Sequence, residues 1–276
     1  MKAIALHSVV PVRAEAREAS EQNTQMLFAE TCTVLEQKDR WSRVKLDADG
    51  QEGWVDAKMV TPMSAAEYKR HHAALRTAAT VVFPMAYAVS ENNGQTIPLT
   101  ASTKLTNYQI QTANGASVGH FEVLGVGFRI EPGMVADKPL TLNEQNLLQA
   151  VRFFLNVPYL WGGKNAMGMD CSGFTQVIMS LFGKTLLRNA SEQATQGRKI
   201  SDLKKAQSGD LVFFDHHDGK ISHVGIVLQV PQPAGANPVT LIHCSGRVKV
   251  EKLDADGIFS AEQGGYTHHL VSIRRI

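Results

Sequence analysis

Cys171 lies in a sequence context that is typical of a reactive thiol. It lies in the segment YLWGGKNAMGMDCSGF, behind Gly162, Gly163 and Gly168 and at the start of an apolar helical pattern. Glycines let backbone segments approach closely, and the first turn of a helix offers unpaired N–H groups and a dipole that favour an anion. Because the thiolate is the attacking form of cysteine, this placement predicts a lowered thiol pKa and nucleophilic catalysis at Cys171.

A thiol nucleophile needs a base, and two histidines in strand-like segments are candidates. His223 lies in KISHVGIVL and His243 in TLIHCSG. Adjacent antiparallel strands can bring two such side chains to one face, so that one ring takes the thiol proton and the other fixes its tautomer. A thiolate–imidazolium pair predicts a bell-shaped rate profile with both limbs near neutrality. Cys244 follows His243 directly, faces the other side of the strand and is expected in the core.

The elements around these residues follow an α+β order. Thr141 to Glu144 read as a capping box that opens a helix ended by Pro158, and a second helix runs from Cys171 to about Gly183. A short helix is expected over 191–196, followed by strands DLVFF, ISHVGIVLQV, VTLIHCS and HLVSIRRI, with HHDG as a hairpin turn. Helices first and antiparallel strands afterwards indicate an α+β domain, with cysteine before histidine as in papain-like enzymes.

The N-terminal half reads as β structure. Short strands with an Asp49-Gly50 hairpin turn predict a small barrel over 1–62. A capping box at Ser64 opens a helix to about Leu75, and turn-punctuated strands between Thr80 and Val135 predict a second small β unit. We therefore expect three parts, 1–62, 63–138 and 139–276.

Composition excludes several classes of protein. The 276 residues are 43% hydrophobic and 20% charged, with a net charge of +2 and no run of basic residues that would bind nucleic acid. No stretch reaches the roughly 18 apolar residues of a membrane span, and the first residues do not form a signal peptide, so we expect a cytoplasmic protein. Three cysteines, an odd and sparse count, argue against a disulfide framework.

Four motifs in order, GMDCSGF, SGDLVFF, ISHVGIV and LIHCSG, resemble the NlpC-type peptidase domain over about 141–276. The resemblance implies a papain-like fold with Cys171 as nucleophile, His223 as base and His243 as the orienting third residue. It also implies that Tyr159 shapes the oxyanion site. The flanking residues Asp170 and Ser172 match substrate-contacting positions, although Asp170 also suits a helix N-cap. Arg188 in LLRNASEQ matches a family segment and has either a substrate role or a structural one.

The N-terminal segment resembles the bacterial SH3 domains that precede such peptidases in enzymes cutting free γ-D-glutamyl peptides. In those enzymes a glutamate of the second strand segment binds the free amine of the substrate, and Glu30 in LFAET occupies that position. The sequence departs from the pattern at Ala29, where glycine is frequent, and at Gln51, where an aromatic residue is common. The implied substrate is a small murein peptide, L-Ala-γ-D-Glu-diamino acid, with no cofactor.

Three other functions are compatible with parts of this sequence. An amidase or acyl-transfer enzyme would employ the same Cys–His pair, and His243 as the third residue favours the peptidase. A non-catalytic wall-binding protein would be expected to lack a catalytic residue, yet all three are present. A metal protein would draw on His216, His217, His268 and His269, but HExxH and paired CxxC motifs do not occur.

Overall fold

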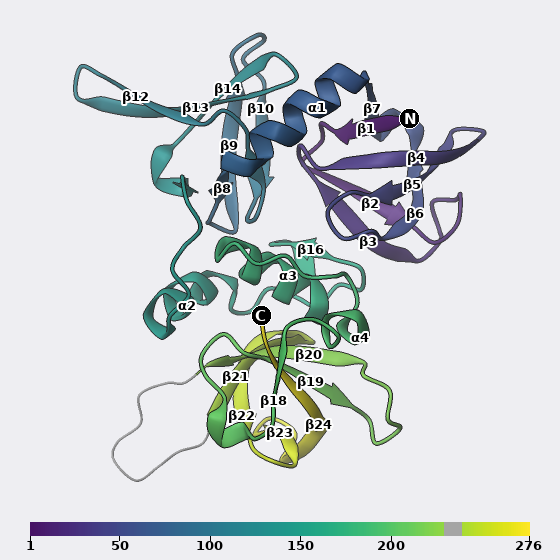
Figure 1. The fold of residues 1–276 in the computed structure, drawn as a ribbon, viewed down its shortest axis with the longest axis vertical. Coiled ribbons are helices and arrows are strands. Elements are labelled where there is room, and N and C mark those ends of the chain that lie inside the picture. The colour runs from purple at the N-terminus through teal and green to yellow at the C-terminus, as the bar shows by residue number, and fades with distance from the viewer. Residues whose placement is uncertain (229–238) are drawn as a thin grey trace. The chain divides into compact units, whose positions relative to one another are not determined.

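The computed structural model describes residues 1–228 and 239–276 (Figure 1). The chain forms two compact units, Met1–Leu140 and Thr141–Ile276, so the main boundary falls two residues after the expected one. The last two residues of the expected strand ISHVGIVLQV, Gln229 and Val230, lie outside the described residues. Among the helices of the described residues, none combines the length and the apolar character needed to span a membrane.

The first unit begins with a seven-stranded antiparallel sheet in the order β3-β2-β6-β5-β4-β1-β7. The expected hairpin at Asp49-Gly50 joins β5 to β6, and Gly50 has a φ of 76° there, which only glycine adopts at little cost. Apolar side chains alternate with charged ones along β5, so one face of the sheet fills a core. The elements are β1 Lys2–Ala5, β2 Val9–Arg13, β3 Gln22–Leu27, β4 Thr31–Lys38, β5 Trp41–Leu46, β6 Glu52–Asp56, η1 Ala57–Met59 and β7 Val60–Met63.

Helix α1 (Ala65–Ala74) follows, with the expected capping box between Ser64 and Glu67. A five-stranded sheet in the order β10-β9-β14-β13-β12 and a three-stranded sheet in the order β11-β8-β15 complete the unit. The segment that follows α1 is therefore mainly β structure, as expected. The elements are η2 Leu75–Thr77, β8 Ala79–Val81, β9 Met85–Ser90, β10 Thr96–Thr100, β11 Lys104–Leu105, β12 Gln109–Ala113, β13 Ala116–Val123, β14 Val126–Ile130, η3 Pro132–Met134 and β15 Val135–Ala136.

The second unit opens with helices. Helix α2 (Glu144–Val151) is capped by Asn143, whose side chain accepts from the backbone N–H of Asn146, so the expected capping box at Thr141 was wrong by two residues. The helix gives way to a 3-10 turn, η4, at Arg152–Phe154, before Pro158 is reached. Helix α3 (Cys171–Leu181) matches the expected second helix. The remaining early elements are β16 Lys164–Asn165, β17 Gly168–Met169, α4 Ala190–Gln193, β18 Arg198–Ile200 and η5 Leu203–Lys205.

A seven-stranded sheet in the order β18-β24-β19-β20-β21-β22-β23 completes this unit, which is α+β as expected (Figure 1). The HHDG segment lies in the turn between antiparallel β19 and β20, and Asp215 accepts from the backbone N–H groups of His217 and Gly219. Three strands of this sheet, β18, β22 and β23, were not expected. The strands are β19 Leu211–Asp215, β20 His223–Leu228, β21 Val239–Ser245, β22 Arg247–Leu253, β23 Gly257–Ser260 and β24 Gly265–Arg275.

Candidate active site

Cys171 is the first residue of α3, as the sequence predicts, and Asp170 is its N-cap. The thiol is 6% exposed, and backbone N–H groups of Val224 and Ser172 point at the sulfur. Burial raises the pKa of the thiol to about 11, the carboxylate of Asp170 adds to the rise, and the two N–H groups oppose it. The expected lowering of this pKa was therefore wrong, because removal from water outweighs the helix terminus. The resting thiol is protonated.

Glycines on both sides of Cys171 allow the close backbone approach that the sequence predicts before it. A Cβ on Gly163 would lie 2.4 Å from the carbonyl oxygen of Gly168, and one on Gly173 would lie 2.1 Å from the carbonyl oxygen of Gly163. Gly162 has a φ of 74°, in the left-handed region. Side chains at these positions would push the loop away from α3 and displace the thiol.

His223 and His243 lie on adjacent strands and share one face, as expected. Nε2 of His223 is 2.7 Å from Nδ1 of His243, and both rings are buried. Gly225 lies opposite His243 in the ladder, and a Cβ there would come within 3.1 Å of the His243 Cβ. Burial lowers the pKa of His223 well below 6.5, and the neighbouring His243 lowers it further, so the ring is neutral at neutral pH. The backbone N–H of Val224 points at the thiol, and His223 is the residue directly before Val224 in the chain.

Sequence reasoning missed a carboxylate that ends this chain of contacts. Glu251 on β22 accepts a hydrogen bond from Nε2 of His243 at 2.8 Å, and the Lys249 ammonium lies 3.2 Å from its other oxygen. Lys249 pairs with His243 across the ladder, so Glu251, two residues further, lies on the same face. Burial acts to raise the pKa of Glu251, but the bonds from His243 and Lys249 outweigh it and bring the pKa to about 2.

The contacts fix the tautomer of both rings. Because the Glu251 carboxylate only accepts, Nε2 of neutral His243 carries the proton and its Nδ1 is an acceptor. Nε2 of His223 must then donate to that Nδ1. This leaves Nδ1 of His223 without a proton, which is the state that a base for the Cys171 thiol needs.

A third histidine covers His223. The His268 ring on β24 stacks on it with centroids 4.3 Å apart and an interplanar angle of 28°. The sequence had suggested His268 only as a possible metal ligand, together with His216, His217 and His269. His268 instead lies between His216 and His223, and burial, followed by the nearby His243, lowers its pKa to about 4. Within 1–228 and 239–276, His, Cys, Asp and Glu side chains form no group of three suited to a metal ion.

Tyr159 lies in the loop that precedes the glycines, with its backbone N–H bonded to the carbonyl of Gly246. Burial raises the pKa of its hydroxyl above the usual value, and the charges of Cys171 and Asp170 raise it further. The hydroxyl therefore keeps its proton at neutral pH, so it has a hydrogen bond to donate. Its part in an oxyanion site stays a prediction. Cys244 is buried and bonds to the carbonyl of Met169, in agreement with its expected place in the core.

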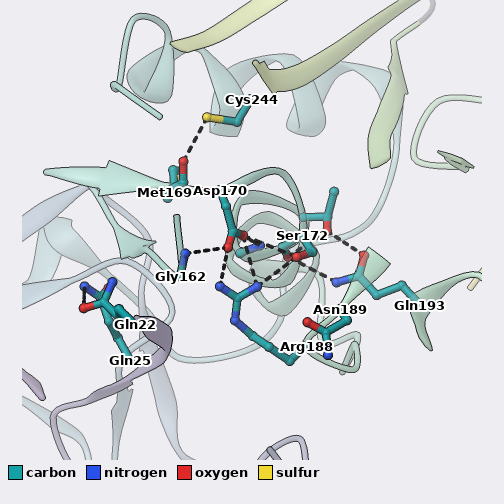
Figure 2. Close-up of polar contacts among 12 residues, drawn as sticks. Gln22, Gln25, Gly162, Met169, Asp170, Ser172, Arg188, Asn189, Gln193 and Cys244 are labelled. Atoms are coloured by element: carbon teal, nitrogen blue, oxygen red, sulfur yellow. Dashed lines mark hydrogen bonds and ion pairs between the residues drawn. The ribbon is translucent and has the colours of Figure 1, made fainter. Parts of the chain in front are cut away.

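Asp170, Ser172 and Arg188 form one buried network at the start of α3 (Figure 2). Arg188 is 1% exposed and donates to both carboxylate oxygens of Asp170 and, at 2.8 Å, to the Ser172 hydroxyl. The same carboxylate accepts from the backbone N–H groups of Gly162 and Gly173. These bonds tie the glycine loop to the start of α3. Substrate contacts by the three side chains stay predictions, and the geometry gives Arg188 its structural role.

Glu30 belongs to the first unit. It lies in the turn between β3 and β4 rather than in a strand, which corrects the expectation. Its carboxylate accepts from the backbone N–H of Leu27 at 3.0 Å. Ala29 before it has a φ of 65°, which explains why glycine suits this position. Recognition of a substrate amine by Glu30 stays a prediction.

Comparisons with known proteins agree with both resemblances. Residues 156–275 match the NlpC/P60 family and residues 12–59 the bacterial dipeptidyl-peptidase SH3 domain. The chain is 30% identical over 215 residues to a γ-D-glutamyl-L-lysine dipeptidyl-peptidase of Bacillus subtilis, and 26% identical over 230 residues to one of Bacillus cereus. The matches cover 74% and 76% of this chain and 68% and 66% of those proteins.

Solved structures show the same fold. A family member from Bacillus cereus superposes with a TM-score of 0.79 at 19% identity, over 100% of this chain and 99% of that one. An endopeptidase from Photobacterium damselae gives a TM-score of 0.71 at 14% identity, over 98% of this chain and 70% of that one. With the sequence match at 30% identity, these findings establish that the chain belongs to the NlpC/P60 family and carries an N-terminal SH3 domain of the dipeptidyl-peptidase type.

Proposed function

We propose that the chain is a cysteine peptidase that hydrolyses the bond between γ-D-Glu and the diamino acid of free murein peptides. The observation that supports it most is the chain of contacts from Glu251 through His243 to His223, beside a thiol at the start of α3. That chain leaves a bare ring nitrogen on His223. That nitrogen is free of a proton and can take one from a neighbouring thiol.

The reaction follows in two halves. The Cys171 sulfur attacks the γ-carbonyl carbon of D-Glu while its proton passes to Nδ1 of His223, and the carbonyl oxygen becomes an oxyanion near the Tyr159 hydroxyl. The C–N bond then breaks, and the diamino acid leaves with the proton from His223. Water, deprotonated by the same ring, hydrolyses the thioester and releases L-Ala-D-Glu and the free thiol.

Neutral starting groups suit this sequence of steps. Since burial disfavours both the thiolate and the imidazolium, the ion pair forms only as the sulfur attacks. Glu251 then stabilises the positive charge that spreads over the two rings. His268, stacked on His223, covers one face of the base and keeps water from it.

Specificity for free peptides is the second part of the proposal. The carboxylate of Glu30 binds the α-amino group of an unblocked N-terminal L-Ala, so that a blocked or wall-linked peptide is rejected. Two relatives are named γ-D-glutamyl-L-lysine dipeptidyl-peptidases, which supports a dipeptide product. Free murein peptides arise during wall recycling, and we place the enzyme in the cytoplasm, where such peptides are processed.

The test compares free and N-acetylated L-Ala-γ-D-Glu-diamino acid as substrates, with products identified by mass spectrometry. The wild type is expected to release L-Ala-D-Glu from the free peptide and to leave the acetylated one intact. Glu30→Gln should lower kcat/KM for the free peptide by about tenfold or more, because one charged contact contributes roughly 1.5–3 kcal/mol.

Glu36→Gln is the matched control, since Glu36 is an exposed carboxylate of β4 that lies 3.9 Å from Arg43. It should behave like the wild type. Equal cleavage of both peptides by the wild type would refute amine recognition. Release of L-Ala instead of the dipeptide would place the cut at the L-Ala–D-Glu bond and would refute the proposed bond specificity.

A further inference from the structure

Backbone hydrogen bonds hold nearly every peptide group of the turn that carries Glu30. The backbone N–H of Ala29 donates to the carbonyl of Ala5, and the N–H of Ala5 donates to the carbonyl of Glu30. The N–H of Glu30 donates to the carbonyl of Leu27. The turn is therefore rigidly attached to β1, and its geometry decides where the Glu30 carboxylate points.

One contact in this turn comes from outside the first sheet. Nε2 of His71, on α1, lies 3.0 Å from the carbonyl oxygen of Ala29, and the ring is only 6% exposed. A carbonyl only accepts, so Nε2 carries a proton and donates it. Burial lowers the pKa of His71, which keeps the ring neutral at neutral pH. His71 thus bonds to the peptide group that directly precedes Glu30, at the residue whose φ of 65° sets the direction of the turn.

A second anchor comes from the β unit that follows α1. The Phe28 side chain is 1% exposed and packs edge-on against Phe128 at 5.6 Å and Phe121 at 6.4 Å between ring centroids. Those two rings stack on each other at 5.0 Å. Phe28 thereby joins a core supplied mainly by strands β8 to β14, with Ile4 and Met63 from the first sheet, rather than the core inside that sheet. Residues 28 and 29 are both tied to parts of the chain that follow the SH3 barrel.

We propose that α1 and the second β unit position the substrate-binding turn, with His71 as a positioning residue for Glu30. The inference rests on the proposed amine recognition by Glu30. Residues 65–136 then contribute to substrate specificity. His71 donates a hydrogen bond to the backbone carbonyl of the residue before Glu30, and Phe121 and Phe128 pack against the side chain of Phe28. Loss of either anchor lets the turn relax and moves the carboxylate away from the substrate amine.

The test is a double-mutant cycle between His71 and Glu30, measured as kcat/KM for free L-Ala-γ-D-Glu-diamino acid. His71→Ala should raise KM and lower kcat/KM by about tenfold, since a displaced contact forfeits most of its binding contribution. In the Glu30→Gln background the same change should cost less than about twofold, because the contact that His71 positions is already lost. The rate of Cys171 alkylation by iodoacetamide should not change.

Two further variants complete the cycle. His71→Gln keeps an N–H donor at similar reach and should stay within about twofold of the wild type. His72→Ala, at the exposed neighbouring position, is the matched control and should have no effect. Should His71→Ala fail to fold by circular dichroism, Phe28→Leu replaces it in the cycle and should show the same loss and the same dependence on Glu30.

The outcomes separate this inference from the function on which it rests. A loss that depends on Glu30 supports the positioning role. An equal loss in both backgrounds, or no loss from His71→Ala in the wild-type background, overturns it. If Glu30→Gln itself leaves kcat/KM unchanged, or the wild type cleaves the acetylated peptide equally well, amine recognition fails first, whatever His71 does.

Discussion

Replacement of Glu251 by glutamine probes the part of the site that the sequence did not reveal. Glutamine keeps the shape of the side chain and one acceptor oxygen but removes the charge. The carboxylate lies 2.8 Å from Nε2 of His243, whose ring is fully buried, and the imidazolium that forms during attack must share its charge through that bond. We therefore expect the variant to fold and to react slowly.

The magnitude follows from the burial of the pair. A hydrogen bond to a charged partner contributes about 1.5–3 kcal/mol. With about 1.4 kcal/mol for each factor of ten, Glu251→Gln should lower kcat/KM by roughly ten- to one-hundred-fold. The loss should appear mainly in kcat, because Glu251 is expected to act on the transition state and not on the bound peptide.

The assay follows release of the diamino acid from the free tripeptide at pH 7, with wild type and variant at equal folded concentration. Glu262→Gln is the control, since Glu262 also lies near Lys249, at 3.7 Å, but its side chain is 55% exposed. Its ion pairs should contribute little, and the variant should stay within about twofold of the wild type. A Glu251→Gln enzyme with wild-type kcat would refute the view that the carboxylate supports the base.

Three other predictions follow from the same structure. The rate should hold a plateau from below pH 6.5 to above pH 9, since burial lowers the pKa of His223 well below 6.5 and raises that of Cys171 to about 11; limbs near neutrality in a pH–kcat/KM profile would contradict this. The folded pKa of Glu251, about 2, lies below its usual 4.5, so the stability it adds is present above pH 4.5 and is lost as the pH falls toward 2; acid unfolding of Glu251→Gln should lack that part of the pH dependence. Ala29→Gly should raise the free energy of unfolding by up to about 1 kcal/mol, because Ala29 has a φ of 65°; a lower denaturant midpoint would contradict it.

Local patterns in the sequence were sufficient to predict the core of the site. The glycine loop, the N-cap at Asp170 and the apolar face of α3 all lie within a few residues of Cys171, and each has a direct physical signature. The two histidines were found because their strands are short, apolar and consecutive in the chain. For these residues, sequence neighbours are also spatial neighbours.

Glu251 could not be found in this way. The segment RVKVEKL alternates charged and apolar residues, and the usual interpretation turns the valines inward. In the structure Val248 is buried, as that interpretation expects, but Val250 is 44% exposed and Glu251 is buried against His243. The pairing of β22 with β21 decides which face is inside, and that register depends on contacts that the local sequence does not specify.

The thiol pKa and the place of Glu30 were misjudged for related reasons. The helix terminus does favour a thiolate, but the depth of burial of Cys171 depends on how β20 packs against α3, and burial outweighs the terminus. Glu30 was expected in a strand segment because of the resemblance to bacterial SH3 domains. The left-handed conformation of Ala29 ends β3 two residues earlier, and that conformation is fixed by contacts with β1 and His71.

Mass analysis of the reaction products tests whether Cys171 is the nucleophile. Wild type and Cys171→Ala are each incubated with L-Ala-γ-D-Glu-diamino acid, and the mixtures are analysed by mass spectrometry. The wild type should yield L-Ala-D-Glu and the free diamino acid. The Cys171→Ala protein should leave the peptide whole, because no other group of the site can form the acyl-enzyme. Dipeptide release by pure Cys171→Ala at a rate near that of the wild type would contradict the account.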